Sequence, residues 1–488
     1  MTASAIRAAR VQEGPAQLHR AMGFRDLLLF YLVTGFSVRW IGTAASAGPS
    51  AVVIWLTACF AFYVPLMFTV LELSSRYPNE GGCYVWSKRA FGDFAGFITG
   101  WTYWTSNLPY FPGLFYFTAA TALFIGGPEW RQLADRPLYF IGFSLLALAL
   151  AAGLNVRGLA VGKWLHNLGA VGLWIPGLFL MALGLVAWAR FGSATPFTSE
   201  SIVPSTRLKD IVFWSTIAFS LSGLESASMM GEEIRDARRN IPRALLIAGG
   251  LITALYVLGT VAMLVALPQA EILRLQGFMT AIETVSLKLD VGGLVPLIAV
   301  LIVLGGLGQA GAWFAAAGRL PFVAGLDRFL PRVFGRIHPR YGSPHVSLLA
   351  QAAVAAGFIL LGQAGTTVKG AYDVLVSMSI ITYFIPYLFM FASMIRLQRE
   401  PAGPEVIRVP GGRPVAVALA TLGFTVTTVS IALALIPAED EPDKMLAVLK
   451  VAGLTILLVA GGRWSTSSAP GGHMIATEAE FGAESTRL

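Results

Sequence analysis

Twelve runs of mostly apolar residues, each long enough to cross a bilayer as a helix, follow one another along this chain. A helix needs about 20 such residues to span the ~30 Å hydrocarbon core. Only helices and closed barrels satisfy every backbone N–H and C=O there, and a barrel would show short alternating strands instead. The sequence therefore predicts an all-α integral membrane protein, with spans at residues 27–48, 51–74, 94–125, 138–154, 164–188, 211–231, 244–267, 292–317, 346–362, 371–395, 415–436 and 446–462.

The low charge of the chain supports this class. Charged residues make up 13% of the 488 positions and apolar residues 56%, whereas a soluble domain carries about 25% charged residues. The longest loop, 318–345, is too short for a folded domain. We therefore expect the function to be carried out within the lipid bilayer. Residues 463–488 are small and polar, and they predict a disordered cytoplasmic tail.

The basic residues predict the orientation of the spans. If the N-terminus lies inside, the inner segments hold 24 of the 35 Lys and Arg residues. This bias predicts a multi-pass protein of the cell membrane with both termini in the cytoplasm. The net charge of +8 is spread over several loops, which argues against a nucleic-acid-binding surface. Residues 1–26 lack an apolar core, so no cleavable signal peptide is expected.

The sequence predicts no metal site, no cofactor and no enzyme activity. Cys59 and Cys83 have no metal-binding spacing, and the five His residues are scattered. Neither cysteine falls in an outer loop, so no disulfide-linked partner protein is expected. The pattern Gly306-Leu-Gly308-Gln-Ala-Gly311 matches a dinucleotide fingerprint, but no strand precedes it. We interpret its glycines, like Gly96 and Gly100, as sites of close helix packing.

Two spans contain segments that predict an interrupted helix. The first span holds Gly42-Thr-Ala-Ala-Ser-Ala-Gly48-Pro49, and the sixth holds Ser220-Leu-Ser222-Gly223. Paired breaks in corresponding halves indicate a transporter built from inverted repeats, with its substrate near the membrane midplane. Tight helix crossing is the alternative explanation for the small residues.

Two long motifs and two short ones resemble a known family. They are Glu72-Leu-Ser-Ser-Arg76-Tyr-Pro-Asn-Glu80-Gly81-Gly82-Cys-Tyr84-Val-Trp86, the segment from Gly223 to Arg243, Gly311-Ala-Trp313 and Ile385-Pro386-Tyr387. Over residues 25–460 the chain resembles the amino acid-polyamine-organocation (APC) permeases. The resemblance implies a LeuT-like fold of twelve helices, in which the first and sixth helices unwind around an amino acid or a polyamine. Two inverted five-helix repeats would occupy residues 27–395, after a cytoplasmic segment 1–26 and before a cytoplasmic loop and two further helices in 396–462.

The expected substrate contacts follow from the breaks and from the resemblance. A half-helix N-terminus presents free N–H groups and a positive dipole end to a carboxylate. The candidates for that contact are the backbone groups of Gly42, Thr43, Ala44 and Ala45. Carbonyl groups are the candidates for the substrate ammonium, around Phe219, Ser222 and Gly223. The resemblance implies that the Phe219 ring closes over the ligand and that further pocket residues are Trp313, Ser106, Asn107 and Tyr383. Simple packing is the alternative for the aromatic side chains.

Two charged residues lie inside apolar runs. A carboxylate at the depth of Glu225 is costly unless it is paired, protonated or hydrated. The resemblance implies that Glu225 takes part in proton sensing or coupling; the alternatives are contact with a cationic substrate and an internally hydrogen-bonded residue that holds the sixth span. Arg39 departs from the family pattern. Our hypothesis is that its fixed charge replaces a sodium ion between the first and eighth spans. Alternatively, Arg39 extends to the headgroups, or it pairs with Glu225 or with a substrate carboxylate.

These features together predict a secondary active transporter of an amino acid or an amino-acid-derived amine. It would work by alternating access, with proton coupling or exchange, without sodium and without an obligatory protein partner. The alternatives are an amino-acid-sensing receptor that does not cycle and a sodium-coupled symporter of the same fold. The sequence does not separate basic substrates from others.

Overall fold

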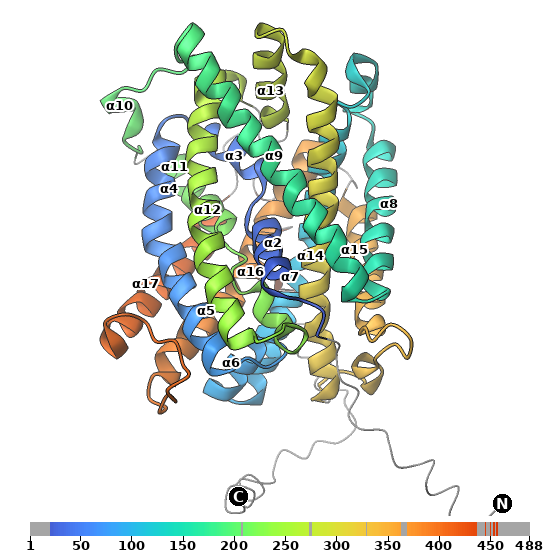
Figure 1. The fold of residues 1–488 in the computed structure, drawn as a ribbon, viewed down its shortest axis with the longest axis vertical. Coiled ribbons are helices and arrows are strands. Elements are labelled where there is room, and N and C mark those ends of the chain that lie inside the picture. The colour runs from blue at the N-terminus through green and yellow to red at the C-terminus, as the bar shows by residue number, and fades with distance from the viewer. Residues whose placement is uncertain are drawn as a thin grey trace, which may run out of the picture.

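The computed structural model describes residues 20–436 except 206–207, 273–275, 328 and 363–367, together with a few positions between 445 and 456. The predicted twelfth span is almost wholly outside these residues, and so is the predicted tail 463–488. The described helices form one bundle in which most of them run along its long axis (Figure 1). Apart from an isolated bridge between Met22 and Ile234, the described elements are helical, which confirms the all-α prediction.

The helices follow one another in this order: α2 (Phe24–Gly35), α3 (Val38–Ala45), α4 (Ser50–Ala58), the π-helical turn η1 (Cys59–Tyr63), α5 (Val64–Arg76), α6 (Cys83–Phe91), α7 (Asp93–Ala122), η2 (Gly127–Leu133), α8 (Pro137–Val156), α9 (Leu159–Phe191), α10 (Ser199–Ile202), α11 (Leu208–Ser220), the 3-10 helix η3 (Ser226–Glu233), α12 (Ala237–Ala266), η4 (Gln269–Glu271), α13 (Gly277–Lys288), η5 (Gly292–Leu294), α14 (Val295–Leu326), η6 (Arg332–Gly335), α15 (His345–Gly362), α16 (Val368–Leu397) and α17 (Gly412–Ala434).

The predicted spans coincide with helices wherever the chain is described. Eight helical segments of the described chain are long and apolar enough to cross a membrane. Three further predicted spans are helical but fall outside this group, namely α7, α11 and α15. Thr, Tyr and Trp residues lower the hydropathy of α7, and α11 ends after 13 residues. The count of twelve therefore stays a prediction.

The interruption of the first helix is not where the sequence predicted it. The helix stops at Gly35 and restarts at Val38, with Ser37 in an extended conformation (φ −143°). Residues Gly42–Ala45 lie inside the regular helix α3, so the expectation of unwound backbone there is wrong. Gly48 (φ +81°) and Pro49 instead form the turn into α4. Small residues such as Gly42 and Ala44 are compatible with a helix, and the break occurs where other helices supply hydrogen-bond partners.

The interruption of the sixth helix is confirmed. Helix α11 ends at Ser220, and the chain continues as the 3-10 helix η3 from Ser226. Between them Gly223 has a φ of +110°, a conformation that residues with a Cβ rarely adopt. The break therefore has a local cause that is readable in the sequence.

Hydrogen bonds tie α2 of the first helix to η3 of the sixth helix at both ends of these segments. The Met22 N–H donates to the Glu233 carbonyl at 3.2 Å, and the Arg235 N–H donates to the Met22 carbonyl at 2.9 Å. Near the breaks, the hydroxyls of Thr34 and Ser226 are hydrogen-bonded at 3.1 Å. These bonds join α2 and η3 into one unit.

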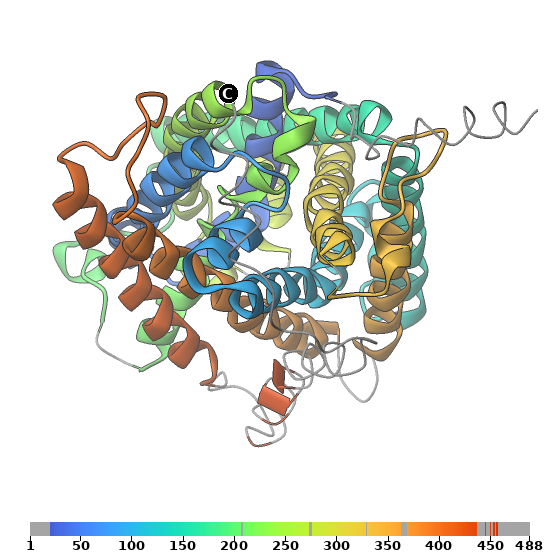
Figure 2. The ribbon, with the colours of Figure 1, turned by 90° about the horizontal axis from the view of Figure 1, so that it is seen from below.

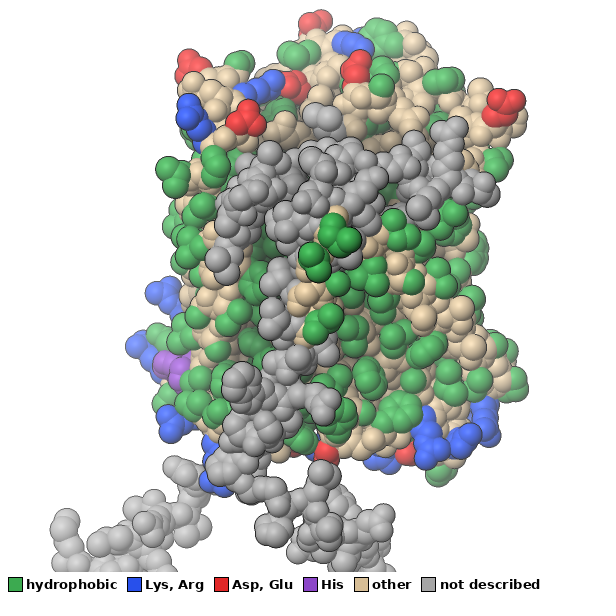
Figure 3. Space-filling model, turned by 180° about the vertical axis from the view of Figure 1, so that it is seen from behind, with side chains coloured by type: hydrophobic (Ala, Val, Ile, Leu, Met, Phe, Trp, Pro, Cys, Tyr) green, Lys and Arg blue, Asp and Glu red, His purple; other side chains and the backbone are tan. Residues whose placement is uncertain are grey.

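The surface has the pattern of a membrane protein. A broad band of hydrophobic side chains separates two charged ends, and Lys and Arg gather at the lower end (Figure 3). Exposed Leu138, Leu146, Leu168 and Leu185 on α8 and α9 contribute to the apolar surface. Seen from below, α17 and α15 lie at opposite sides of the bundle (Figure 2). The middle of the bundle is left to the interrupted helices and their neighbours.

Glycines allow α9 and α14 to pack closely, as the sequence predicted. A Cβ added at Gly308 would lie 2.4 Å from the Gly169 Cα and 2.6 Å from the Leu165 carbonyl oxygen. A Cβ at Gly306 would meet the Thr118 hydroxyl at 2.3 Å. The discounted dinucleotide pattern is therefore a packing surface of α14.

We expect Gly308→Ala to lower the melting temperature of the detergent-solubilised protein, measured by tryptophan fluorescence. Overpacking of this kind costs about 1–3 kcal/mol. The matched control is Gly153→Ala on α8, where an added Cβ meets nothing within 4 Å. There the better helix propensity of Ala should be neutral or stabilising by up to about 1 kcal/mol. Equal shifts in the two variants would contradict the packing role of Gly308.

Candidate functional site

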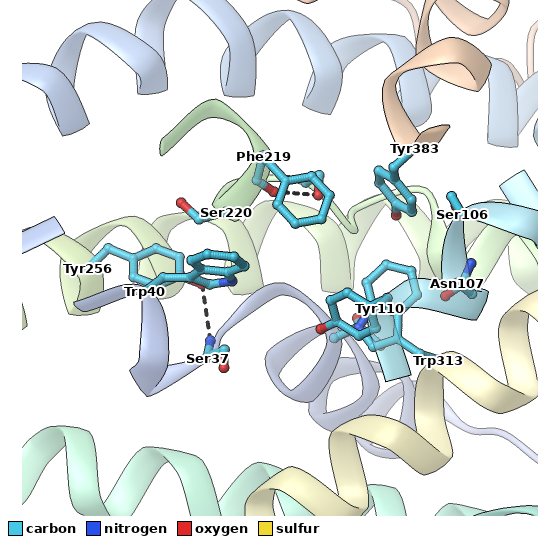
Figure 4. A pocket seen from close by; sticks show the side chains of 12 residues that line it. Ser37, Trp40, Ser106, Asn107, Tyr110, Phe219, Ser220, Tyr256, Trp313 and Tyr383 are labelled. Atoms are coloured by element: carbon cyan, nitrogen blue, oxygen red, sulfur yellow. Dashed lines mark hydrogen bonds between the residues drawn. The ribbon is translucent and has the colours of Figure 1, made fainter. Parts of the chain in front are cut away.

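A pocket lies where the two interrupted helices meet α7, α12, α14 and α16 (Figure 4). The volume inside it that is open to a water molecule is about 20 Å³, so the pocket is too small for a substrate in this conformation. The lining side chains are uncharged, and most are aromatic or hydroxyl-bearing: Thr34, Ser37, Trp40, Ser106, Asn107, Tyr110, Phe219, Ser220, Ser222, Tyr256, Trp313 and Tyr383. The site therefore offers rings and polar groups but no charge in its immediate wall.

Six of the residues that the sequence singled out come together in this wall: Ser106, Asn107, Phe219, Ser222, Trp313 and Tyr383. Gly223 lies beside them, since a Cβ there would be 3.1 Å from the Trp313 ring. Residues Gly42, Thr43, Ala44 and Ala45 do not line the pocket, because they lie further along α3. Helix α3 begins at Val38, and Ser37 and Trp40 on either side of that position line the pocket.

Five aromatic rings of the wall form a continuous series of contacts, each ring touching the next. Trp40 meets Phe219, and Phe219 meets Tyr383, with ring centroids 5.7 Å apart in both cases. Tyr383 then meets Trp313 at 5.7 Å, and Trp313 meets Tyr110 at 5.8 Å. We call these five residues the aromatic circuit. Its two ends, Trp40 and Tyr110, lie on either side of one cation.

That cation is Arg39, whose guanidinium carbon lies 4.3 Å from the Trp40 ring centroid and 4.8 Å from that of Tyr110. Aromatic faces attract a guanidinium in this geometry. Arg39 is 2% exposed, so the snorkelling alternative is wrong. None of the ion pairs within the described chain includes Arg39, which excludes pairing with Glu225 in this conformation. Its Nε has no hydrogen-bond partner among these residues.

Glu225 is held by tyrosines instead. The hydroxyls of Tyr103 and Tyr387 donate to its carboxylate at 2.7 Å and 2.5 Å, and Tyr383 donates to it as well. The hydroxyls of Tyr103 and Tyr383 are also 3.2 Å apart. Glu225 is 1% exposed. This network connects η3 to α7 and α16, between the pocket residues at 219–222 and the lower end of the bundle.

Side chains from distant helices satisfy the backbone at the first break. The Tyr256 hydroxyl accepts from the Ser37 N–H at 3.0 Å and donates to the Gly35 carbonyl at 3.1 Å. The Gln309 amide donates to the carbonyls of Val33 and Phe36 at 2.8 Å and 2.9 Å. The polar side chain that joins the first and eighth spans is thus Gln309. An amide in the middle of an apolar run is the signal that could have identified it.

The carbonyls at the second break already have partners. The Phe219 carbonyl accepts from the Ser222 N–H at 3.0 Å, and the Gly223 carbonyl accepts from the Ser226 N–H at 3.2 Å. Each carbonyl also accepts from a serine hydroxyl at 2.6 Å, Phe219 from Ser222 and Gly223 from Ser226, so both lone pairs of each are used within the chain in this conformation. Six residues of the pocket wall were not identified from the sequence as ligand contacts, namely Thr34, Ser37, Trp40, Tyr110, Ser220 and Tyr256. Aromatic residues make up 11% of the chain, so position alone does not distinguish them.

A buried charge cluster lies below the tyrosine network. Arg319 of α14 pairs with Glu233 at 2.7 Å, and Glu80 is 4.0 Å away from the same nitrogen. Glu80 accepts from the Glu232 N–H at 3.1 Å through one oxygen, while its other oxygen has no hydrogen-bond partner within the described chain. Burial raises the pKa of the Glu80 carboxyl well above its ordinary value, and Glu233 adds to the rise, while Arg319 opposes it.

Comparison with known proteins agrees with this architecture. Residues 23–457 match the family described as amino acid permease. An uncharacterized transporter of Legionella pneumophila is 29% identical over 86% of this chain and 90% of its own length. A probable agmatine/putrescine antiporter of Lactococcus lactis is 23% identical over 89% of this chain and 92% of its own. A glutamate/serine transporter of Bacillus subtilis is 24% identical over 71% of this chain and 66% of its own.

We expect Glu80→Gln to stabilise the protein increasingly as the pH rises from 5 to 8. The folded wild type holds the Glu80 proton more tightly than the unfolded chain does, so its stability falls as the pH rises above the ordinary carboxyl pKa. Each pKa unit corresponds to about 1.4 kcal/mol. Gln keeps the acceptor for the Glu232 N–H and does not titrate.

The measurement is the melting temperature at several pH values, with Glu271→Gln as the matched control because the Glu271 side chain is exposed on η4. The control should follow the wild type. A Glu80→Gln variant that keeps the wild-type pH dependence would contradict the raised pKa.

Proposed function

The chain belongs to the amino acid permease family, and on that premise we propose that it is a secondary active transporter of an amino acid or an amino-acid-derived amine. It is a membrane transporter rather than an enzyme. The observation that carries the proposal is the pocket between two interrupted helices, since broken backbone at membrane depth is found where it is buried or lines a ligand cavity. The names of the relatives, which include agmatine, putrescine, glutamate and serine, support this substrate range.

We assign residues 27–395 to two inverted five-helix repeats and residues 396–462 to a loop and two additional helices, with cytoplasmic segments before and after them. The lower end of the bundle, where Lys and Arg gather, would face the cytoplasm of the cell (Figure 3). This orientation makes the tyrosine network and the Arg319 cluster two closed layers between the pocket and the cytoplasm.

Alternating access requires both layers to open. The first layer opens when Tyr103 and Tyr383 release Glu225, because these bonds join η3 to α7 and α16. The second opens when Arg319 separates from Glu233. On the other side of the pocket, the contact of Phe219 with Trp40 would have to part. Phe219 and Tyr383 both belong to the aromatic circuit. A substrate that rearranges the circuit would therefore affect the closing contacts on both sides of the pocket.

Glu225 is the proposed proton-coupling residue. Three tyrosine hydroxyls donate to its carboxylate, two of them to one oxygen and one to the other. A proton on Glu225 would remove its negative charge and so weaken all three of these charge-assisted hydrogen bonds. Proton binding thus loosens the first closed layer without any change elsewhere in the pocket.

The proposed transport is independent of sodium. The carbonyls of Val33 and Phe36, freed by the first break, are oxygens of the kind that coordinate a cation. The Gln309 amide donates to both of them. The sequence hypothesis was that Arg39 replaces a sodium ion at the junction of the first and eighth spans. We propose that Gln309 replaces it instead. A non-cycling sensor and a sodium-coupled symporter are the alternatives that transport measurements separate.

The test is counterflow into proteoliposomes with labelled amino acids and polyamines, each at pH 5.5 and 7.5, with and without sodium. We expect accumulation of one substrate group, with a pH dependence and no sodium dependence. Binding without any accumulation would favour the sensor, and stimulation by sodium would favour the symporter.

We expect Glu225→Gln to keep substrate exchange but to lose its pH response, because the amide cannot take up the coupling proton. The matched control is Glu129→Gln on η2, an exposed acid outside the pocket, which should keep the wild-type profile. A Glu225→Gln variant with an unchanged pH profile would exclude Glu225 as the coupling group.

A further inference from the structure

The charges around the pocket are unbalanced. Its wall is uncharged, and the two charged residues nearest to it along the chain are Arg39 and Glu225. Glu225 uses its oxygens on three tyrosines, one of which, Tyr383, lies in the pocket wall. Arg39 lies against the rings of Trp40 and Tyr110 and interacts with the Tyr110 hydroxyl, and none of the ion pairs in the described chain includes it. Among the side chains that the structure describes, the uncompensated charge at the site is therefore positive.

Arg39 borders an extension of the pocket rather than the junction of α2 with α14. A second gap, which has no room for a water molecule in this conformation, is lined by Arg39 together with Pro109, Leu375 and Ser379. It shares Trp40, Tyr110 and Phe219 with the main pocket. The guanidinium thus lies next to the pocket, behind the aromatic circuit, and a ligand would reach it once these shared side chains part.

A buried arginine without a carboxylate is costly, because no opposite charge offsets the lost hydration. The cost falls when a carboxylate binds to it, and the planar guanidinium can hold both carboxylate oxygens at once. The Arg39 Nε, which lacks a hydrogen-bond partner in the described chain, is one of the donors for that bond. The site is therefore poised for an anionic group at this end.

The α-amino and α-carboxylate groups of an amino acid have other contacts available. The N-terminal end of α3 is positive, and the C-terminal end of α11 is negative. Arg39 is therefore available to bind a second carboxylate, one on the side chain of the substrate. A polyamine or a basic amino acid would instead place an ammonium near the guanidinium with no acid in the pocket wall.

We propose that the substrate is a dicarboxylic amino acid whose side-chain carboxylate binds Arg39. This assignment rests on the proposed transport function. Arg39 then selects the substrate, and Glu225 remains free to respond to protons. The same geometry disfavours diamines and guanidino compounds.

The test compares each acid with its amide, which has nearly the same shape. Counterflow of labelled L-glutamate, L-aspartate, L-glutamine, L-asparagine and putrescine is measured in proteoliposomes with the wild type, Arg39→Gln, Arg39→Lys and the control Arg190→Gln, whose arginine is exposed at the end of α9. We expect the wild type to prefer each acid over its amide by at least tenfold. Arg39→Gln should abolish that preference, Arg39→Lys should keep part of it, and Arg190→Gln should keep all of it.

Preference of the wild type for the amides or for putrescine would overturn the inference while leaving the transport function intact. An Arg39→Gln variant that weakens acids and amides equally would also overturn it, because Arg39 would then be structural. Failure of all five compounds to exchange would overturn the inference, and the proposed function itself falls if the wider panel of amino acids and polyamines also fails to accumulate. If Arg39→Gln does not elute as a single species in detergent, the inference is tested by the preference of the wild type and of Arg39→Lys for each acid over its amide.

Discussion

The need to satisfy backbone groups at two helix breaks governs this structure. An unpaired N–H or C=O at membrane depth has no water to bind, so each break needs partners from other helices. Tyr256 and Gln309 supply them at the first break, from α12 and α14. At the second break, Tyr387 of α16 accepts from the Gly223 N–H at 3.1 Å. The pocket exists because these three helices are held against the breaks.

Tyr387 has a second role that joins the breaks to the charged residues. The hydroxyl that accepts from Gly223 also donates to Glu225. A change in the protonation of Glu225 therefore reaches the backbone of the second break through one atom. Arg39 is separated from this network by the aromatic circuit, so the two buried charges act on different sides of the same cavity.

The sequence predicted the features that have local causes. Apolar length predicted the membrane helices, and Gly223 marked the second break because its backbone conformation requires glycine. The first break was misplaced by several residues, because its cause lies in Tyr256 and Gln309, more than 200 positions further along the chain. Arg39 and Glu225 stood out since a charge inside an apolar run is rare. The aromatic circuit did not, because its five rings come from five segments that only the fold brings together.

The hydrogen bonds of Met22 have a mechanical consequence. They fasten the start of α2 to the end of η3, and the Thr34–Ser226 bond fastens the same two segments near the pocket. Segments fixed at two points cannot slide past each other or hinge apart separately. In the proposed transport cycle, α2 and η3 would therefore move as one rigid arm. The side of the cavity that they close would open in a single concerted movement rather than by the withdrawal of one helix at a time.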